Sequence, residues 1–151
     1  MAFKLSNKSI AKMEGIDPRL IEVVKAAIQT THVDFGVIEG LRSVERQREL
    51  VAKGASQTMA SKHIEGLAVD LAAYIGDRLS WEITLYDDIA DAVVMAAIDL
   101  DVPIRWGAAW HIADIREWDG SMQDATDDYV KLRRSQGKRP FIDAPHFEIN
   151  G

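Results

Sequence analysis

Apolar residues recur at the spacing of an α-helix in two long segments, and this predicts two amphipathic helices. The first helix begins at Asp17 and Pro18, a preferred N-cap and a preferred first helical residue, and extends to about Thr30. Its apolar stripe consists of Leu20, Ile21, Val24, Ala27 and Ile28. The second helix spans about residues 84–100, because Pro103 prevents its continuation. Its stripe consists of Ile89, Val93, Ala96, Ala97 and Leu100.

Four shorter segments have the composition of β-strands. Residues 33–40 form a strand that ends at glycine, and residues 104–106 form a short one. In the strand over residues 66–73, Val69 and Leu71 face one side, while Asp70 faces the other side with the neighbouring alanines. Residues 145–149 form a last strand, with His146 and Glu148 on one face. The alternation therefore places one carboxylate, Asp70, on a rigid strand of small apolar residues.

The remaining segments complete a single domain over residues 1–151. Residues 1–16 are predicted to be an irregular lead-in, and residues 55–62 a loop. Ser43 can cap a helix over residues 44–53 that Gly54 ends, and another helix covers residues 124–134. Turns are predicted at residues 75–78 and 137–140, whereas residues 108–120 have no clear pattern. The chain contains no internal repeat or linker.

Composition excludes several classes of protein. Charged residues make up 28% of the 151 residues and hydrophobic residues 47%, which is incompatible with a disordered chain. The net charge of −6 argues against a general nucleic-acid binder. No apolar run is long enough for a signal peptide or a membrane span, so we expect no membrane insertion. Without cysteine, a zinc ion would have to be held by histidine and carboxylate.

Two stretches contain the residues that can perform chemistry. His63 and Asp70 lie in the first and His146 in the second, and together they are three potential zinc ligands. A catalytic zinc site keeps its fourth position for water, and Asp143 would then be a spare carboxylate that takes the proton of that water. The residues alone leave structural alternatives open. His63 could be a surface loop histidine, and Asp70 a buried, hydrogen-bonded aspartate. His146 could merely close a strand, and Asp143 could be a turn residue.

These motifs, taken in order, resemble those of the LAS-type zinc peptidases, which are VanY-like. The resemblance rests on Ser61-x-His63-x(6)-Asp70 with Gly66 and Ala68 inside it, on Asp143-x-x-His146, on Gly40-Leu-Arg42-Ser43-x(3)-Gln47 and on Arg105-Trp106-Gly107-Ala-Ala-Trp110. It extends from about Val33 to Ile149. The family includes D-alanyl-D-alanine peptidases and the L-alanyl-D-glutamate endolysins of tailed phages, and the last motif is similar to that of the endolysins.

The resemblance implies a fold and a set of roles. The fold would be a small α+β domain, an antiparallel sheet with helices packed against it, as in the hedgehog-like zinc peptidases. One zinc ion per chain would be held by His63, Asp70 and His146, with Asp143 as general base. Arg42 would face the substrate and either bind a carboxylate or stabilise the oxyanion. Some relatives have glutamate in place of Asp143, and the shorter aspartate must lie closer to the water.

Further residues are candidates for contacting the substrate or for orienting a metal ligand. Glu148 would orient a ligand imidazole, although an exposed strand carboxylate is equally ordinary. Four residues are candidate substrate contacts, each with a structural alternative such as ordering a loop or packing in the core. They are Ser61, Gln47, Trp106 and Trp110.

The function predicted from this resemblance is that of an endolysin, a bacteriolytic hydrolase that cuts the L-alanyl-D-glutamate bond of peptidoglycan stem peptides. A D-alanyl-D-alanine carboxypeptidase is the alternative within the family, and a non-catalytic zinc-containing module that binds the wall or a protein is the alternative outside it. The short chain without a signal peptide favours the endolysin. We expect a monomer without a separate wall-binding domain, which accumulates in the cytoplasm of the producing cell and acts on the wall after release.

Overall fold

The computed structural model describes residues 3–56 and 58–150. The elements follow one another as α1 (Asn7–Lys12), α2 (Pro18–Thr30), β1 (Asp34–Glu39), α3 (Val44–Ala52), β2 (Ala68–Ile75), β3 (Arg78–Ser80), α4 (Ile83–Leu100), β4 (Ile104–Trp106), the 3-10 helix η1 (Ile115–Glu117), α5 (Met122–Ser135) and β5 (His146–Ile149).

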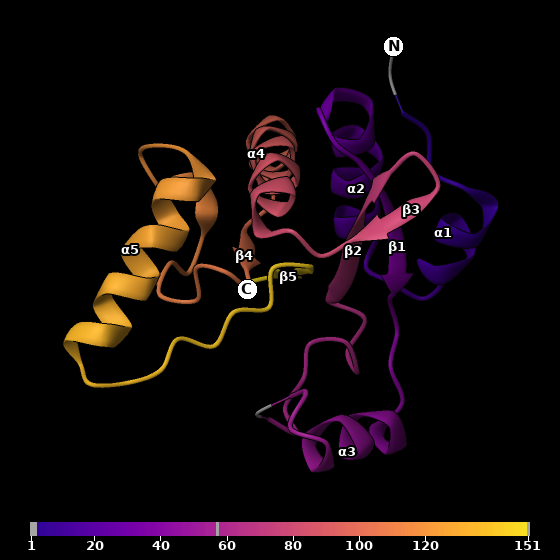
Figure 1. The fold of residues 1–151 in the computed structure, drawn as a ribbon. Helices are drawn as coiled ribbons and strands as arrows, with labels where there is room; N and C mark the ends of the chain where they lie inside the picture. The colour runs from indigo at the N-terminus through magenta and orange to yellow at the C-terminus, as the bar shows by residue number, and fades with distance from the viewer. Residues whose placement is uncertain (1–2, 57, 151) are drawn as a thin grey trace.

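An antiparallel sheet organises the molecule. Its strands lie in the order β1-β2-β5-β4, and β3 pairs with the end of β2 that β5 leaves free. Helices α2 and α4 pack against each other, and α5 lies beside α4, as Figure 1 shows. Helix α3 lies apart from these helices, beyond the ends of β1 and β2 (Figure 1). The structure thus confirms the predicted α+β fold with an antiparallel sheet and helices packed against it.

The two faces of this sheet differ in chemistry. Alternate residues of the strands belong to the apolar core, among them Val37, Val69, Leu71, Trp106 and Phe147. Because successive side chains of a strand point to opposite faces, the residues between them face away from that core. On this second face, β2, β4 and β5 present Asp70, Arg105, His146 and Glu148. One face of the sheet therefore stabilises the fold, and the other presents polar side chains.

The N-terminal lead-in is more ordered than predicted. Residues 7–12 form helix α1, where we expected irregular chain, and the Ser6 hydroxyl accepts a hydrogen bond from the Ser9 amide at its start. Ser9 then accepts a hydrogen bond of 2.9 Å from the backbone amide of Val37 in β1. A six-residue helix is too short to be stable alone, so α1 depends on this contact with β1. Because the contact joins distant parts of the chain, the local sequence does not predict the helix.

Two other expectations change in detail. Leu100, predicted to belong to the core stripe of α4, is 43% exposed, because the helix ends there and Asp101 turns the chain with a left-handed backbone. The unassigned residues 108–120 contain the single turn η1, which begins at an Asp114 cap. Within the described ranges, no helix has both the length and the hydrophobicity needed to cross a bilayer.

Candidate metal centre and active site

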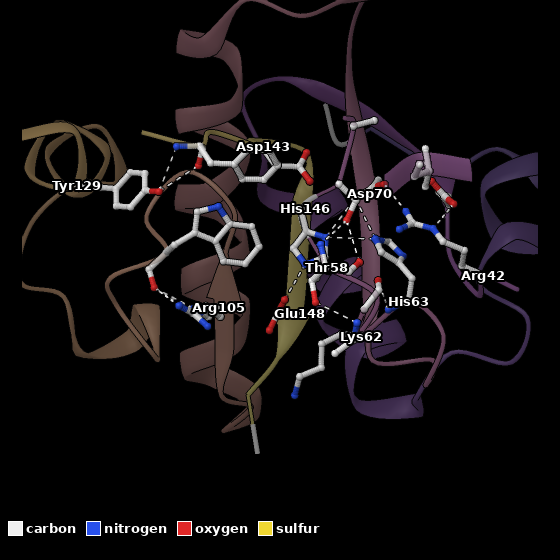
Figure 2. Close-up of a pocket in the computed structure, with 18 of the residues that line it drawn as sticks. Arg42, Thr58, Lys62, His63, Asp70, Arg105, Tyr129, Asp143, His146 and Glu148 are labelled. Atoms are coloured by element: carbon white, nitrogen blue, oxygen red, sulfur yellow. Dashed lines mark hydrogen bonds and ion pairs between the residues drawn. The ribbon is translucent and has the colours of Figure 1, made fainter. Parts of the chain in front are cut away.

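Three predicted ligands converge at the polar face of the sheet. Asp70 on β2 and His146 on β5 are directly paired in register, and His63 approaches from the loop that precedes β2. One ligand atom from each residue lies within 4.8 Å of the others. Figure 2 shows the two histidines and Asp70 pointing toward one another. The structure therefore contains a His-Asp-His group that can bind a metal ion.

The hydrogen bonds of the two imidazoles orient their free nitrogens toward each other. His63 Nδ1 lies 2.9 Å from the carbonyl oxygen of Gly40, and His146 Nε2 lies 2.7 Å from Glu148 Oε1. Both partners are acceptors, so each of these nitrogens carries the proton in a neutral ring. The remaining nitrogens, His63 Nε2 and His146 Nδ1, are 3.1 Å apart. Two facing lone pairs at this distance require a shared cation, either a proton or a metal ion.

The electrostatics of Asp70 and His146 fit a cation at this point. Asp70 Oδ1 is buried and lies 3.3 Å from His63 Nε2 and 3.5 Å from His146 Nδ1, yet it has no well-aligned hydrogen bond from any described residue. Burial opposes its charge, but the two imidazoles outweigh burial and hold the pKa of Asp70 well below its usual range. Burial likewise lowers the pKa of His146, but Asp70 and Glu148 raise it to about 9. A metal ion can replace the proton that this environment favours.

Asp143 lies next to this group on the chain that leads into β5. Its backbone amide donates to the Gly107 carbonyl over 2.8 Å, and its own carbonyl accepts from the His146 amide over 3.0 Å. The approach to Gly107 is so close that an added Cβ would lie 2.1 Å from the Asp143 carbonyl oxygen. Burial and then repulsion from Asp70 raise the pKa of Asp143 to about 6, against the opposing charges of His146, His63 and Arg42. Such a carboxyl can exchange a proton near neutral pH.

Arg42 is held rigidly at the opposite side of the group. Its Nε donates to Glu39 Oε1 over 2.6 Å, and its Nη1 donates to Gln47 Oε1 over 2.6 Å. Its Nη2 lies 3.6 Å from Asp70 Oδ2. The guanidinium is thus fixed between a carboxylate and an amide, with one edge directed toward Asp70. Sequence analysis missed Glu39, although its position three residues before Arg42 was the available signal.

The other predicted residues separate into two groups. Ser61, Trp110 and Glu148 line the cleft around the metal group. Gln47 and Trp106 were candidate substrate contacts with a structural alternative. Neither is among the described residues that line the cleft, and both side chains are fully buried. Gln47 holds Arg42 instead, and the Trp106 indole N–H donates to the Ala144 carbonyl over 2.7 Å. These contacts favour the structural alternative for both residues.

The cleft encloses about 640 Å³ and extends to both sides of the metal group. One side is formed by α3 and the loop after it, including Ala55, Ser56 and Thr58. The other side is formed by Tyr129 and Arg133 of α5, by Phe141 and by Arg105. Sequence analysis missed the contribution of α5, because helical spacing alone does not tell which distant element a polar residue approaches.

Comparison with known proteins places these features in a family. The family model described as phage L-alanyl-D-glutamate peptidase matches residues 1–150. The L-alanyl-D-glutamate peptidase of Escherichia phage T5 is 30% identical over 115 residues, which cover 74% of this chain and 84% of that protein. The crystal structure of the Serratia marcescens L-Ala D-Glu endopeptidase ChiX matches with a TM-score of 0.72 and 33% identity, and the match covers 97% of this chain and 90% of that one. The chain therefore belongs to the phage L-alanyl-D-glutamate peptidase family.

Proposed function

We propose that this protein is a zinc peptidase that hydrolyses the L-alanyl-D-glutamate bond of peptidoglycan stem peptides. One observation supports this most directly. Two imidazole nitrogens and a carboxylate converge within 4.8 Å at the floor of a cleft, next to a further carboxyl group, Asp143, that has no salt bridge among the described residues. The names of the relatives supply the bond, since both the phage and the Serratia protein are L-alanyl-D-glutamate peptidases.

The donor set of the site is suited to zinc. His63 Nε2, His146 Nδ1 and one oxygen of Asp70 would hold the ion, and Glu148 and the Gly40 carbonyl would hold the two imidazoles in the required tautomers. When bound, zinc supplies a Lewis acid that polarises the scissile carbonyl and lowers the pKa of a coordinated water toward ~7.

Asp143 moves the proton in this proposal. Its carboxylate accepts a proton as the oxygen of water bonds to the alanyl carbonyl carbon, and the acid form then donates that proton to the glutamate nitrogen as the C–N bond breaks. The pKa of about 6 allows both steps near neutral pH. Arg42, fixed by Glu39 and Gln47, offers its remaining N–H groups to the oxyanion or to a carboxylate of the substrate.

The proposal also covers the organisation and site of action of the protein. Residues 1–151 would form one peptidase domain, and the match of the family model to residues 1–150 supports this. The protein would be a monomer that accumulates in the cytoplasm of the producing cell and reaches the wall after release.

Digestion of purified wall peptides tests the proposal. Zinc-loaded wild type, His63→Ala and His32→Ala would be compared, with products identified by mass spectrometry and metal measured on each protein. His32 is an exposed residue outside the cleft, so His32→Ala is a matched control. We expect new N-terminal D-glutamate from wild type and His32→Ala, and neither product nor stoichiometric zinc with His63→Ala. Release of free D-alanine instead would assign the carboxypeptidase reaction, and zinc-loaded wild type without any product would contradict catalysis.

A further inference from the structure

The two sides of the cleft differ in charge. On the α3 side, most lining residues of the helix and its loop are uncharged, namely Leu50, Ala55, Ser56, Thr58 and Ala60. The exception in this loop is Lys62, whose Nζ donates to the Ile149 carbonyl over 3.1 Å. On the α5 side, Arg105 and Arg133 bring two guanidinium groups beside Tyr129 and Phe141. Figure 2 shows Arg105 and Tyr129 on one side of the two histidines and Arg42 on the other. A substrate that lies across the metal group therefore meets mostly uncharged residues and the paired Arg42 on the α3 side. On the α5 side it meets two arginines that form no salt bridge with any described residue.

The arginines of the cleft are not equally available to a ligand. Arg42 is paired with Glu39 and lies near Asp70, so its charge is compensated. Arg105 donates two hydrogen bonds to the Trp110 carbonyl, and its guanidinium lies 5.2 Å from the centre of the Trp110 ring.

Arg133 has the weakest set of partners among the arginines of the cleft. Its Nη2 has a long hydrogen bond of 3.4 Å to the Arg139 carbonyl, and its buried Nε has no partner among the described residues. Within the same residues, no carboxylate forms a salt bridge with it. A partly buried guanidinium without a counter-charge is costly, and a bound carboxylate would remove that cost.

The substrate of the proposed reaction carries such a carboxylate. In an L-alanyl-D-glutamate bond, the glutamate nitrogen belongs to the scissile amide, and glutamate has two carboxyl groups. One of them continues the stem peptide, so the other remains a free anion a few bonds from the scissile nitrogen. The alanine on the other side of the bond contributes only a methyl group. The asymmetry of the substrate thus matches the asymmetry of the cleft.

We propose that Arg133 binds the free carboxylate of the D-glutamate residue and thereby sets the direction of the substrate in the cleft. The glutamate side of the scissile bond lies toward α5, and the alanine side lies toward the loop after α3. Asp143, the proposed proton donor to the leaving glutamate nitrogen, lines the same cleft two residues after Phe141 on the chain that joins α5 to β5. This inference rests on the proposed function, and it adds a specificity-determining residue outside the family motifs quoted above.

The test uses two peptides that differ in one group. Both contain L-Ala-D-Glu extended through the γ-carboxyl of glutamate, and the α-carboxyl is free in one peptide and a carboxamide in the other. Zinc-loaded wild type is compared with Arg133→Met, which keeps much of the apolar stem, and with Arg134→Met as a matched control. Arg134 is exposed on the same helix and does not line the cleft. Steady-state kinetics give kcat and KM for each pair.

We expect wild type and Arg134→Met to prefer the free acid over the amide by about 10–100-fold in kcat/KM, mainly through KM. Arg133→Met should lose this preference by losing activity on the acid alone. An equal loss on both peptides would assign Arg133 a structural role through Arg139 and overturn the proposal, as would a preference that survives in Arg133→Met. Wild type that cleaves neither peptide at this bond would instead contradict the proposed function.

Discussion

Asp70 and His146 are directly opposite each other on β2 and β5, and both face away from the apolar core. Their neighbours Val69 and Phe147 are also paired, and both belong to that core. A slip of β5 by one residue against β2 would turn His146 toward the core and Phe147 away from it, so packing of the core enforces the register of the metal group. Two of the three candidate ligands are therefore positioned by the sheet itself before any metal binds.

Glu148 should increase the affinity of the site for zinc without contacting the ion. Its Oε1 lies 2.7 Å from His146 Nε2 and fixes the tautomer that directs Nδ1 toward His63. Glu148→Ala removes this acceptor, and we expect about 10–100-fold weaker zinc binding. Glu148→Gln keeps an acceptor oxygen and should lose less. Competition with a chromophoric chelator measures the affinity independently of catalysis.

The zinc affinities of Glu148→Ala and Glu148→Gln relative to wild type decide the role of Glu148. Equal zinc affinity in Glu148→Ala and wild type would show that the sheet alone orients His146. Circular dichroism of both variants controls for loss of the fold, which the packing of Phe147 and Ile149 on the other face of β5 should preserve.

Asp143 should determine the acid limb of the activity profile. Its pKa is raised to about 6, so the carboxyl holds its proton below that pH and cannot act as a base. A bound dication favours the ionised form, so we expect kcat to fall with a midpoint at or below pH 6 as the solution is acidified. Asp143→Asn should lower kcat by about 10²–10⁴-fold and retain zinc.

Rates between pH 4.5 and 8 on a soluble stem peptide, with bound zinc measured at each pH, separate the two causes of acid inactivation. Retained zinc with falling kcat supports the role of Asp143. If Asp143→Asn keeps wild-type activity, another group is the base.

The parts of the molecule that could be predicted from sequence are those with a local pattern. The stripe of α2, the cap at Ser43 and the alternation around Asp70 all depend on neighbouring residues, and the structure confirms these elements. The structure also brings together the three ligands that the motifs indicate. The placement of Gln47 was not predictable, because a polar residue in an amphipathic helix gives no sign that it is fully buried against Arg42. The α5 side of the cleft depends on packing between distant segments, which local spacing does not encode.

Gly107 should be required for the position of Asp143. An added Cβ would lie 2.1 Å from the Asp143 carbonyl oxygen and 3.0 Å from His146 Cβ, so Gly107→Ala must displace the chain that carries both residues. We expect the free energy of unfolding to fall by about 1–3 kcal/mol and kcat/KM to fall by about 10²-fold. Urea denaturation and peptide kinetics measure the two effects.

Gly137→Ala is the control for the loss of stability that replacing a glycine can cause at a position away from Asp143. Gly137 has a φ of +68°, and an added Cβ would have nothing within 4 Å, so its replacement costs about 1 kcal/mol of backbone strain without moving the site. Activity that is equally reduced in both variants would mean that stability, and not the position of Asp143, explains the effect of Gly107→Ala.

Asp87 should make the protein less stable as the pH rises from about 4 to 6. This residue of α4 is 7% exposed, and its buried Oδ1 has no hydrogen-bond partner among the described residues. Burial, followed by the charges of Asp91, Asp127 and Asp88, raises its pKa from 3.8 to about 6. The folded state therefore binds a proton more tightly than the unfolded state, and stability is lost as the pH rises through this window.

Asp87→Asn removes the charge but keeps the shape of the side chain. We expect its free energy of unfolding to exceed that of wild type by about 1–2 kcal/mol at pH 7–8, and the difference to disappear near pH 4. Urea denaturation at several pH values measures both curves, and Asp77→Asn in the exposed turn between β2 and β3 is the matched control. A wild type that is more stable than Asp87→Asn at pH 8 would show that the Asp87 carboxylate has a stabilising partner in solution, because only a partner of the ionised form could reverse the effect of burial.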